Sequence, residues 1–279
     1  MEKRLKEKKL FLLDMDGTIY LDDHLFNGTL DFLNHVKETG GRYLFLTNNS
    51  SRGVDAYVEK LKKLGIEACA EDFLTSVDAT IAFLRKRYSA DCSIGGIGDK
   101  DWRQKKIYLM GTASFRDQME KEGFLLTETP DADTDILLMG FDRELTYRKL
   151  EDASWLLTKG NVEYFATNPD WVCPTAWGSV PDCGSMAQML EHATGRLPYF
   201  IGKPQPDMAL MAMEKYGYGP EETVLIGDRL YTDIACGYNA GIDTIFVLSG
   251  EGTLEDVEKS HIKPAFIIDN IEEIYRRLV

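Results

Sequence analysis

Two aspartates, Asp14 and Asp16, directly follow an apolar run, and their spacing lets both carboxylates act on one ligand. The run Phe11-Leu12-Leu13 has the composition of a buried strand, and Gly17 is typical of a turn. Residues two apart on an extended segment share a face, so both carboxylates can point to one small ligand. Gly17 lets main-chain amides approach that ligand. For this stretch alone, an ordinary strand with an acidic turn remains the alternative.

Polar side chains also follow other apolar runs that we predict to be strands. In a doubly wound parallel sheet, the carboxyl ends of the strands meet at one crevice. We therefore expect these side chains to converge with Asp14 and Asp16. They are Thr47 and Asn48 after 42–46, Lys203 after 199–201, and Asp228 after 223–226, with Asp233 one helical turn beyond Asp228.

The chemistry of this set favours a hard cation and a phosphoryl group. Neighbouring carboxylates repel one another, and each resists ionisation unless a cation joins them. Oxygen ligands without histidine or cysteine select a hard ion, and we predict Mg²⁺. Lys203 adds a point charge and Thr47 adds a hydrogen-bond donor, both suited to phosphoryl oxygens.

Alternating apolar runs and amphipathic segments predict an α/β fold, a Rossmann-like doubly wound parallel sheet with an inserted α/β cap domain. We expect a core segment at 1–80, the inserted unit at 81–181 and a second core segment at 182–279.

The local elements are predicted as follows. A hairpin is expected at 21–28, with its turn at Asn27-Gly28. The Gly-rich stretch 89–106 is interpreted as a flexible insertion, and 167–178 as a polar and aromatic loop. Predicted strands are 11–13, 42–46, 107–110, 136–139, 164–166, 199–201, 223–226, 244–248 and 266–268; predicted helices are 29–39, 54–64, 73–88, 114–122, 147–159, 185–193, 207–216 and 232–240.

Composition excludes several classes of protein. The 279 residues carry 46 acidic and 32 basic side chains, and the net charge of −14 disfavours nucleic acid and anionic membranes as partners. The apolar run near the N-terminus is interrupted by Asp14 and Asp16, so we expect no signal peptide. Five scattered cysteines without a C-x-x-C pair fit a reduced cytoplasm, which is the expected location.

Four ordered motifs resemble those of the haloacid dehalogenase superfamily. The second aspartate of the first motif makes the chain similar to the phosphatases of that superfamily. Thr47 follows Asp16 by only 31 residues, whereas Lys203 follows Thr47 by 156, enough for a cap domain of class II. The detailed motifs resemble class IIA, the NagD-like and para-nitrophenylphosphatase-like hydrolases. They are Asp14-x-Asp16-Gly17-Thr18, Leu46-Thr47-Asn48-Asn49-Ser50, Ala166-Thr167-Asn168-Pro169-Asp170, Gly202-Lys203-Pro204, and Gly227-Asp228-x4-Asp233.

The resemblance implies a role for each catalytic residue in the hydrolysis of small phosphomonoesters such as sugar phosphates, nucleotides and nitrophenyl phosphate. Asp14 would form an aspartyl-phosphate, and Asp16 would protonate the leaving group and then activate water. Lys203 would neutralise phosphoryl charge, and Thr47 and Asn48 would bind phosphoryl oxygens. Mg²⁺ would be held by Asp14, the main-chain carbonyl of Asp16, and Asp228. Asp233 would not bind the ion directly but would orient the groups that do.

The substrate-binding set is completed by Asn49, Asn168 and Asp170. The cap loop also carries Trp171 and Trp177, which either contact the leaving group or only pack. Arg52 and Arg229 follow strands and either assist the anion or are solvated.

The expected partner is a small phosphorylated metabolite, and the resemblance suggests a homodimer. A phosphotransferase or mutase on the same fold, and a non-catalytic sensor of phosphorylated metabolites, are the alternatives. The sensor would be expected to lack a catalytic residue, and none is missing.

Overall fold

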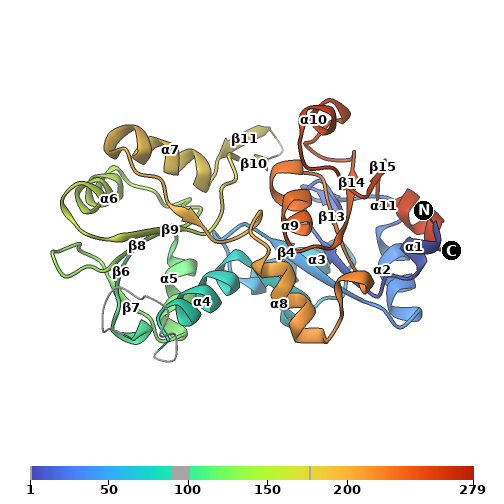
Figure 1. Cartoon of the computed structure of the whole chain (residues 1–279), viewed down its shortest axis with the longest axis horizontal. Coiled ribbons are helices and arrows are strands. Elements are labelled where there is room, and N and C mark those ends of the chain that lie inside the picture. Colours follow the sequence, from blue (N-terminus) through green and yellow to red (C-terminus); the bar gives the residue numbers. More distant parts are fainter. Residues whose placement is uncertain (1, 90–100, 176) are drawn as a thin grey trace.

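The chain forms two α/β units, each built on a parallel sheet (Figure 1). The structure is a computed structural model, and it describes residues 2–89, 101–175 and 177–279. Both chain ends lie on the unit that contains the larger sheet.

The larger sheet has six parallel strands in the order β15-β14-β13-β1-β4-β5. The first strand is central, and the chain builds outward on one side before returning to build the other. Its carboxyl end therefore lies at the point where the strand order reverses, the usual ligand site of such sheets. The strands are β1 (Leu10–Leu13), β4 (Arg42–Thr47), β5 (Phe73–Thr75), β13 (Thr223–Gly227), β14 (Asp243–Val247) and β15 (Phe266–Ile268).

Helices cover both faces of this sheet because its strands are apolar on both sides. Leu10 and Leu12 pack in one core cluster, and Phe11 and Leu13 pack in another on the opposite face. The helical elements of this unit are α1 (Glu2–Lys6), α2 (Thr29–Glu38), α3 (Val54–Lys63), η1 (Ala70–Asp72), α4 (Ser76–Arg87), α8 (Asp207–Tyr216), η3 (Pro220–Glu222), the π-helical turn η4 (Leu230–Ile234), α9 (Ala235–Asn239), α10 (Leu254–Lys259) and α11 (Ile271–Leu278).

The second sheet has five parallel strands in the order β12-β9-β8-β6-β7. One core cluster runs from the first sheet through α4 and α8 to this one, so apolar packing joins the two units. Two short antiparallel hairpins lie outside the sheets. The remaining elements are η2 (Trp102–Gln104), β6 (Lys106–Met110), α5 (Ala113–Lys121), β7 (Leu125–Thr127), β8 (Ile136–Met139), α6 (Tyr147–Lys159), β9 (Glu163–Ala166), α7 (Cys183–Thr194) and β12 (Tyr199–Phe200), with the hairpins β2 (Tyr20–Leu21) to β3 (His24–Leu25) and β10 (Val172–Thr175) to β11 (Gly178–Pro181).

The predicted α/β fold with a doubly wound parallel sheet is confirmed, but the predicted helix at 73–88 is wrong at its start. Thr75 accepts a hydrogen bond from Asp78 N, and the Asp78 carboxylate accepts one from Thr75 N at 2.8 Å. This capping box starts α4 at Ser76. Phe73 and Leu74 are thereby left to pair with β4 as an edge strand.

Other local predictions also need correction. The turn of the first hairpin lies at Asp22 and Asp23, whereas Gly28 precedes α2 as its N-cap. The predicted loop 167–178 contributes to the β10–β11 hairpin. The helix predicted at 232–240 begins as the turn η4. Most of the predicted insertion at 89–106, residues 90–100, lies outside the described residues.

The limits 1–80, 81–181 and 182–279 stay a prediction. Two elements beyond residue 181 belong to the second unit, because β12 pairs with β9 and α7 packs on α6. The chain therefore returns to the first unit later than the predicted limit. The predicted limits place the strand at 199–201 in the first sheet, and this is wrong, because β12 pairs with β9 of the second sheet. The local apolar pattern predicts a strand but not its pairing partner.

No helix within the described ranges combines the length and the apolarity needed to span a bilayer.

Candidate active site

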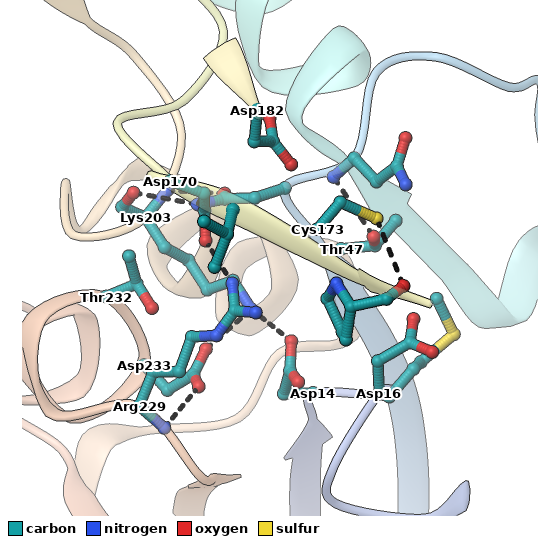
Figure 2. A pocket seen from close by; sticks show the side chains of 15 residues that line it. Asp14, Asp16, Thr47, Asp170, Cys173, Asp182, Lys203, Arg229, Thr232 and Asp233 are labelled. Atoms are coloured by element: carbon teal, nitrogen blue, oxygen red, sulfur yellow. Dashed lines mark hydrogen bonds and ion pairs between the residues drawn. The ribbon is translucent and has the colours of Figure 1, made fainter. Parts of the chain in front are cut away.

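Lys203 joins two carboxylates at the carboxyl end of the large sheet (Figure 2). Its Nζ donates to Asp14 Oδ1 and to Asp233 Oδ1, each at 2.6 Å, and to Leu46 O at 3.1 Å. Asp14 directly follows β1, and its main-chain N–H donates to Ile226 O of the neighbouring strand at 2.9 Å. The predicted convergence of these residues is thus present, with the lysine side chain almost fully buried.

Asn48 holds the main chain of Lys203, which follows β12 of the second sheet, so that the lysine side chain reaches the carboxylates beside β1. The Asn48 Oδ1 accepts from Lys203 N, and Asn48 Nδ2 donates to Lys203 O, both at 2.9 Å. Asn48 is buried, and its own carbonyl accepts a hydrogen bond from Ser76 Oγ. The amide side chain therefore acts as a strand partner for one residue and positions its main chain.

Arg229 and Asp170 form an ion pair between the two units. Arg229 Nη1 donates to Asp170 Oδ1 at 2.6 Å, while Asn48 Nδ2 donates to Asp170 Oδ2 at 2.7 Å. Asn168 Nδ2 donates to the same Oδ2 at 2.9 Å and to Asp182 Oδ1 at 3.1 Å. Burial opposes the charge of Arg229, but Asp170 raises the pKa of the guanidinium above its usual range. Hydrogen bonding thus fixes Asp170 at the boundary of the units.

Asp14, Asp228 and Asp233 each place one carboxylate oxygen within 4.8 Å of the others. Asp228 Oδ2 accepts from Glu251 N at 2.6 Å, but its buried Oδ1 has no hydrogen-bond partner among the described residues. An unpartnered buried carboxylate oxygen is costly without a cation. An oxygen-only donor set of this kind fits Mg²⁺.

Both carboxylate oxygens of Asp233 accept hydrogen bonds, unlike those of Asp228. Its Oδ1 accepts from Lys203, and its Oδ2 accepts from Arg229 N at 3.1 Å. Both oxygens are therefore already engaged by protein donors, which suits a residue that holds other groups in place.

Burial and like charge disfavour ionised carboxylates in this cluster. Burial raises the pKa of Asp14 well above its usual value, Asp233 adds to that rise, and Lys203 opposes it. Burial, then Asp233, raises the pKa of Asp228 to about 7. For Lys203, burial opposes the charge, but Asp14 and Asp233 together raise the ammonium pKa above its usual range. A bound cation would relieve the repulsion between the carboxylates.

Asp16 lies at the open side of the site. Its side chain is 40% exposed, its Oδ2 accepts from Tyr20 OH at 3.3 Å, and Lys60 Nζ lies 3.5 Å from its Oδ1. Thr47 ends β4, and its Oγ1 accepts from Asn49 N at 3.2 Å. The hairpin β2–β3 holds Asp16 from one side, because Gly17 N donates to Tyr20 O at 2.8 Å.

A small cavity of about 50 Å³ is enclosed by these groups and by the β10–β11 hairpin. It is lined by most of the predicted catalytic and substrate-binding residues, together with Arg229. They are Asp14, Asp16, Thr47, Asn48, Asn49, Asp170, Lys203 and Asp233.

One predicted substrate contact, Asn168, and the two tryptophans whose role was left open lie outside the cavity lining. Asn168 is fully buried away from the cavity, where its amide orients Asp170 and Asp182. Trp171 and Trp177 do not line the cavity and are 49% and 77% exposed. The expectation of substrate contact from Asn168 is not supported by this placement, since its Nδ2 donates to two buried carboxylates and its Oδ1 accepts from Thr167 Oγ1 at 2.7 Å.

Sequence reasoning missed Asp182, which lines the cavity and caps α7 by accepting from Cys183 N at 2.5 Å. Burial, with Asp170 adding to it, raises the Asp182 pKa to about 7. An aspartate just before an apolar-periodic segment is an N-cap signal. It starts α7 at Cys183, two residues before the predicted start at Ser185. Nothing in the local sequence linked it to residues more than a hundred positions away.

Comparison with known families gives two matches. Residues 11–125 match the family described as Haloacid dehalogenase-like hydrolase, and residues 200–274 match the family described as HAD-hydrolase-like. Together they span the segments that carry Asp14, Thr47, Lys203 and Asp228.

Individual proteins match over almost the whole chain. An acid sugar phosphatase of Staphylococcus aureus is 30% identical over 98% of this chain and 99% of its own length. The crystal structure of a 4-nitrophenylphosphatase from Thermotoga maritima is 39% identical, with a TM-score of 0.87 over 99% of both chains. A glycerol phosphate phosphatase from Mycobacterium tuberculosis, solved in complex with magnesium, is 26% identical, with a TM-score of 0.84 over 98% of this chain and 78% of that one.

Proposed function

Since this chain belongs to the class IIA branch of the haloacid dehalogenase-like hydrolases and is a phosphomonoester hydrolase, we propose that it cleaves small phosphomonoesters through an aspartyl-phosphate on Asp14. The observation that carries the proposal is the placement of Lys203 between Asp14 and Asp233, beside the open carboxylate of Asp16. The ammonium is positioned to stabilise negative charge beside the attacking oxygen.

In the first step, an Asp14 carboxylate oxygen bonds to phosphorus and the bond from phosphorus to the ester oxygen breaks. Asp16 gives its proton to the departing alkoxide, for which its exposed position beside the cavity is suited. In the second step, Asp16 takes a proton from water, the water oxygen bonds to phosphorus, and the bond to Asp14 breaks. Inorganic phosphate leaves, and both aspartates return to their starting states.

Hydrogen-bond donors and a cation complete the site. Thr47, Asn49 and Lys203 line the cavity and would bind phosphoryl oxygens. Asn48 was expected to do the same, but its side-chain amide is engaged by Lys203 and Asp170, so it holds Lys203 in place instead. Mg²⁺ would be held by Asp14, Asp228 and the main-chain carbonyl of Asp16, with Asp233 supporting them. When bound, the ion supplies positive charge that offsets the negative charge of the phosphoryl group.

The second unit serves as a cap that excludes bulk water. Its β10–β11 hairpin contributes Val172, Cys173 and Pro174 to the cavity wall, and the Arg229–Asp170 pair holds that segment against the core. Exclusion of water strengthens the electrostatic interactions inside such a site.

The proposal also includes a cytoplasmic location, a small phosphorylated metabolite as partner, and a homodimer. The net charge of −14 supports the exclusion of nucleic acid and anionic membranes as partners.

The test is phosphate release from a panel of sugar phosphates, nucleoside monophosphates, glycerol phosphate and para-nitrophenyl phosphate. Wild type, Asp14→Asn and the surface control Asp31→Asn are each assayed with Mg²⁺ or with a chelator. The proposal expects turnover that needs Mg²⁺, survives in Asp31→Asn and is lost in Asp14→Asn. Equal turnover by wild type and Asp14→Asn contradicts it. Transfer of phosphate to an added alcohol in preference to water would favour the phosphotransferase instead.

A further inference from the structure

A second cavity of about 460 Å³ adjoins the catalytic one. Four residues line both: Asp16, Asn49, Cys173 and Pro174. Asp16 is the proposed proton donor, so the part of a substrate bonded to the ester oxygen must extend past it. The second cavity is therefore placed to hold the leaving group, and its volume is within the range of small-molecule sites.

Two arginines line this second cavity from opposite units. Arg52 follows β4 in the core, and Arg143 follows β8 in the cap. Both are exposed, and neither side chain makes a hydrogen bond or an ion pair with the described residues. Lys60 differs, because its Nζ lies 3.5 Å from Asp16 Oδ1 and 3.8 Å from the centre of the Tyr20 ring.

Both arginines lie within electrostatic reach of the boundary between the cavities. Burial raises the pKa of the Cys173 thiol to about 11, and the charge of Arg143 opposes that rise. Burial likewise raises the pKa of Tyr57, and Arg52 is among the groups that oppose it. Tyr57 OH in turn donates to Asn49 O at 3.3 Å. Tyr57 and Cys173 both line the second cavity together with Asp16.

Acidic side chains also line the cavity, but they do not neutralise the arginines by direct pairing. Asp22 and Asp23 lie at the turn of the β2–β3 hairpin, and Glu59 lies on α3. Within the described part of the chain, none of the three lies within 4.0 Å of a basic nitrogen of Arg52 or Arg143. The guanidinium groups remain available to an anionic ligand.

We propose that Arg52 and Arg143 select phosphomonoesters whose leaving group carries a second anionic group, a carboxylate or a further phosphate. This rests on the proposed function, since it assigns the leaving group to the space beyond Asp16. Guanidinium groups bind carboxylate and phosphate with paired, charge-assisted hydrogen bonds. One arginine from each unit lets the second anion also hold the cap against the core.

Matched substrate pairs test the proposal, because each pair differs mainly in the second anion. Glycerol 3-phosphate is compared with 3-phosphoglycerate for the carboxylate, and fructose 6-phosphate with fructose 1,6-bisphosphate for the phosphate. The readout is the ratio of kcat/KM within each pair for wild type, the double variant Arg52→Gln/Arg143→Gln, and the control Lys62→Gln. Lys62 is an exposed α3 lysine that does not line the cavity.

We expect wild type and Lys62→Gln to favour the anionic member of at least one pair by about tenfold, the size of one charge-assisted hydrogen bond. The double variant should bring that ratio to near one while its thermal unfolding midpoint stays with that of wild type. The pair that shows the preference identifies the carboxylate or the phosphate. Ratios near one in wild type, or a preference that persists in the double variant, overturn the inference. Absence of turnover on all four esters and on para-nitrophenyl phosphate overturns the proposed function itself.

Discussion

Asn48 and Lys203 lie 155 residues apart, and the side-chain amide of one pairs with both main-chain polar groups of the other. The two hydrogen bonds are each 2.9 Å long, and both residues are buried. These hydrogen bonds link Asn48, which follows β4 of the first sheet, to Lys203, which follows β12 of the second sheet. The position of the Lys203 ammonium, to which we assign a catalytic role, therefore depends on contact between the two units.

Replacement of this amide should weaken both folding and catalysis. Asn48→Ala leaves Lys203 N and O without these partners in a buried setting, and we expect a loss of about 1–3 kcal/mol in unfolding free energy. Asn239→Ala is the matched control, because that exposed amide donates to Pro204 O at 2.9 Å, next to Lys203. Urea unfolding and kcat of both variants check this. Equal losses in the two variants would contradict the role assigned to Asn48.

Removal of the Lys203 charge should be costly for two reasons. Lys203→Met leaves the partly buried carboxylate of Asp14 and the buried carboxylate of Asp233 without their shared cation, and we expect destabilisation of about 3–5 kcal/mol at neutral pH. It also removes the charge beside Asp14, the proposed nucleophile, so kcat should fall by about a hundredfold or more. The exposed Lys215→Met is the control. A variant that keeps wild-type kcat would show that Lys203 has only a structural role.

Mg²⁺ affinity should rise with pH up to about 7. In the metal-free protein, burial and Asp233 raise the Asp228 pKa to about 7, so below that pH the ion must displace a proton. Calorimetric titration at pH 6 and pH 8 should show tighter binding at pH 8, with proton release detected at pH 6. Asp228→Asn should lose most of the affinity. Equal wild-type affinity at the two pH values would contradict the assignment.

Asp182 should make folding less favourable as pH rises. Its pKa is raised to about 7 in the folded protein, whereas an unfolded chain releases this proton near pH 4. Between these values the folded state binds the extra proton, so unfolding free energy falls by up to about 1.4 kcal/mol per pH unit from this group. Asp182→Asn keeps an acceptor for Cys183 N and should remove that part of the slope. Parallel stability curves for the two proteins from pH 5 to 8 would contradict it.

Gly17 should be needed for the geometry of Asp228. It has a φ of 86°, and an added Cβ would lie 2.6 Å from Asp228 Oδ2. Gly65 has a φ of 84° with nothing within 4 Å of an added Cβ, so Gly65→Ala carries the same backbone strain without the collision. We expect both variants to lose stability, but only Gly17→Ala to bind Mg²⁺ more weakly. Similar Mg²⁺ affinities in the two variants would show that the contact with Asp228 does not matter.

Local pattern was sufficient for most elements and for the residues that converge at β1. Strand composition before Asp14, Thr47 and Asp228 indicated parallel strands, and a doubly wound sheet brings their carboxyl ends together. These predictions succeeded because apolar periodicity and strand-end position are properties of a few consecutive residues.

Elements that depend on distant partners were predicted less well. Phe73–Thr75 is a strand only because β4 offers it an edge, and Tyr199–Phe200 pairs with β9 instead of entering the first sheet. Hairpin β10–β11 was predicted as loop, since its turn and two prolines hid the pairing.

The sequence by itself determined the α/β class, the acidic residues of the site and the oxygen chemistry that suits Mg²⁺, because residue type and order carry that information. Only the tertiary structure decided that Asn48 positions Lys203, that Asp170 pairs with Arg229, and that Asn168 lies behind the cavity. Each of these is a contact between buried polar groups far apart in the chain. Such groups must find partners once water is excluded, and which partners they find depends on how the two units pack.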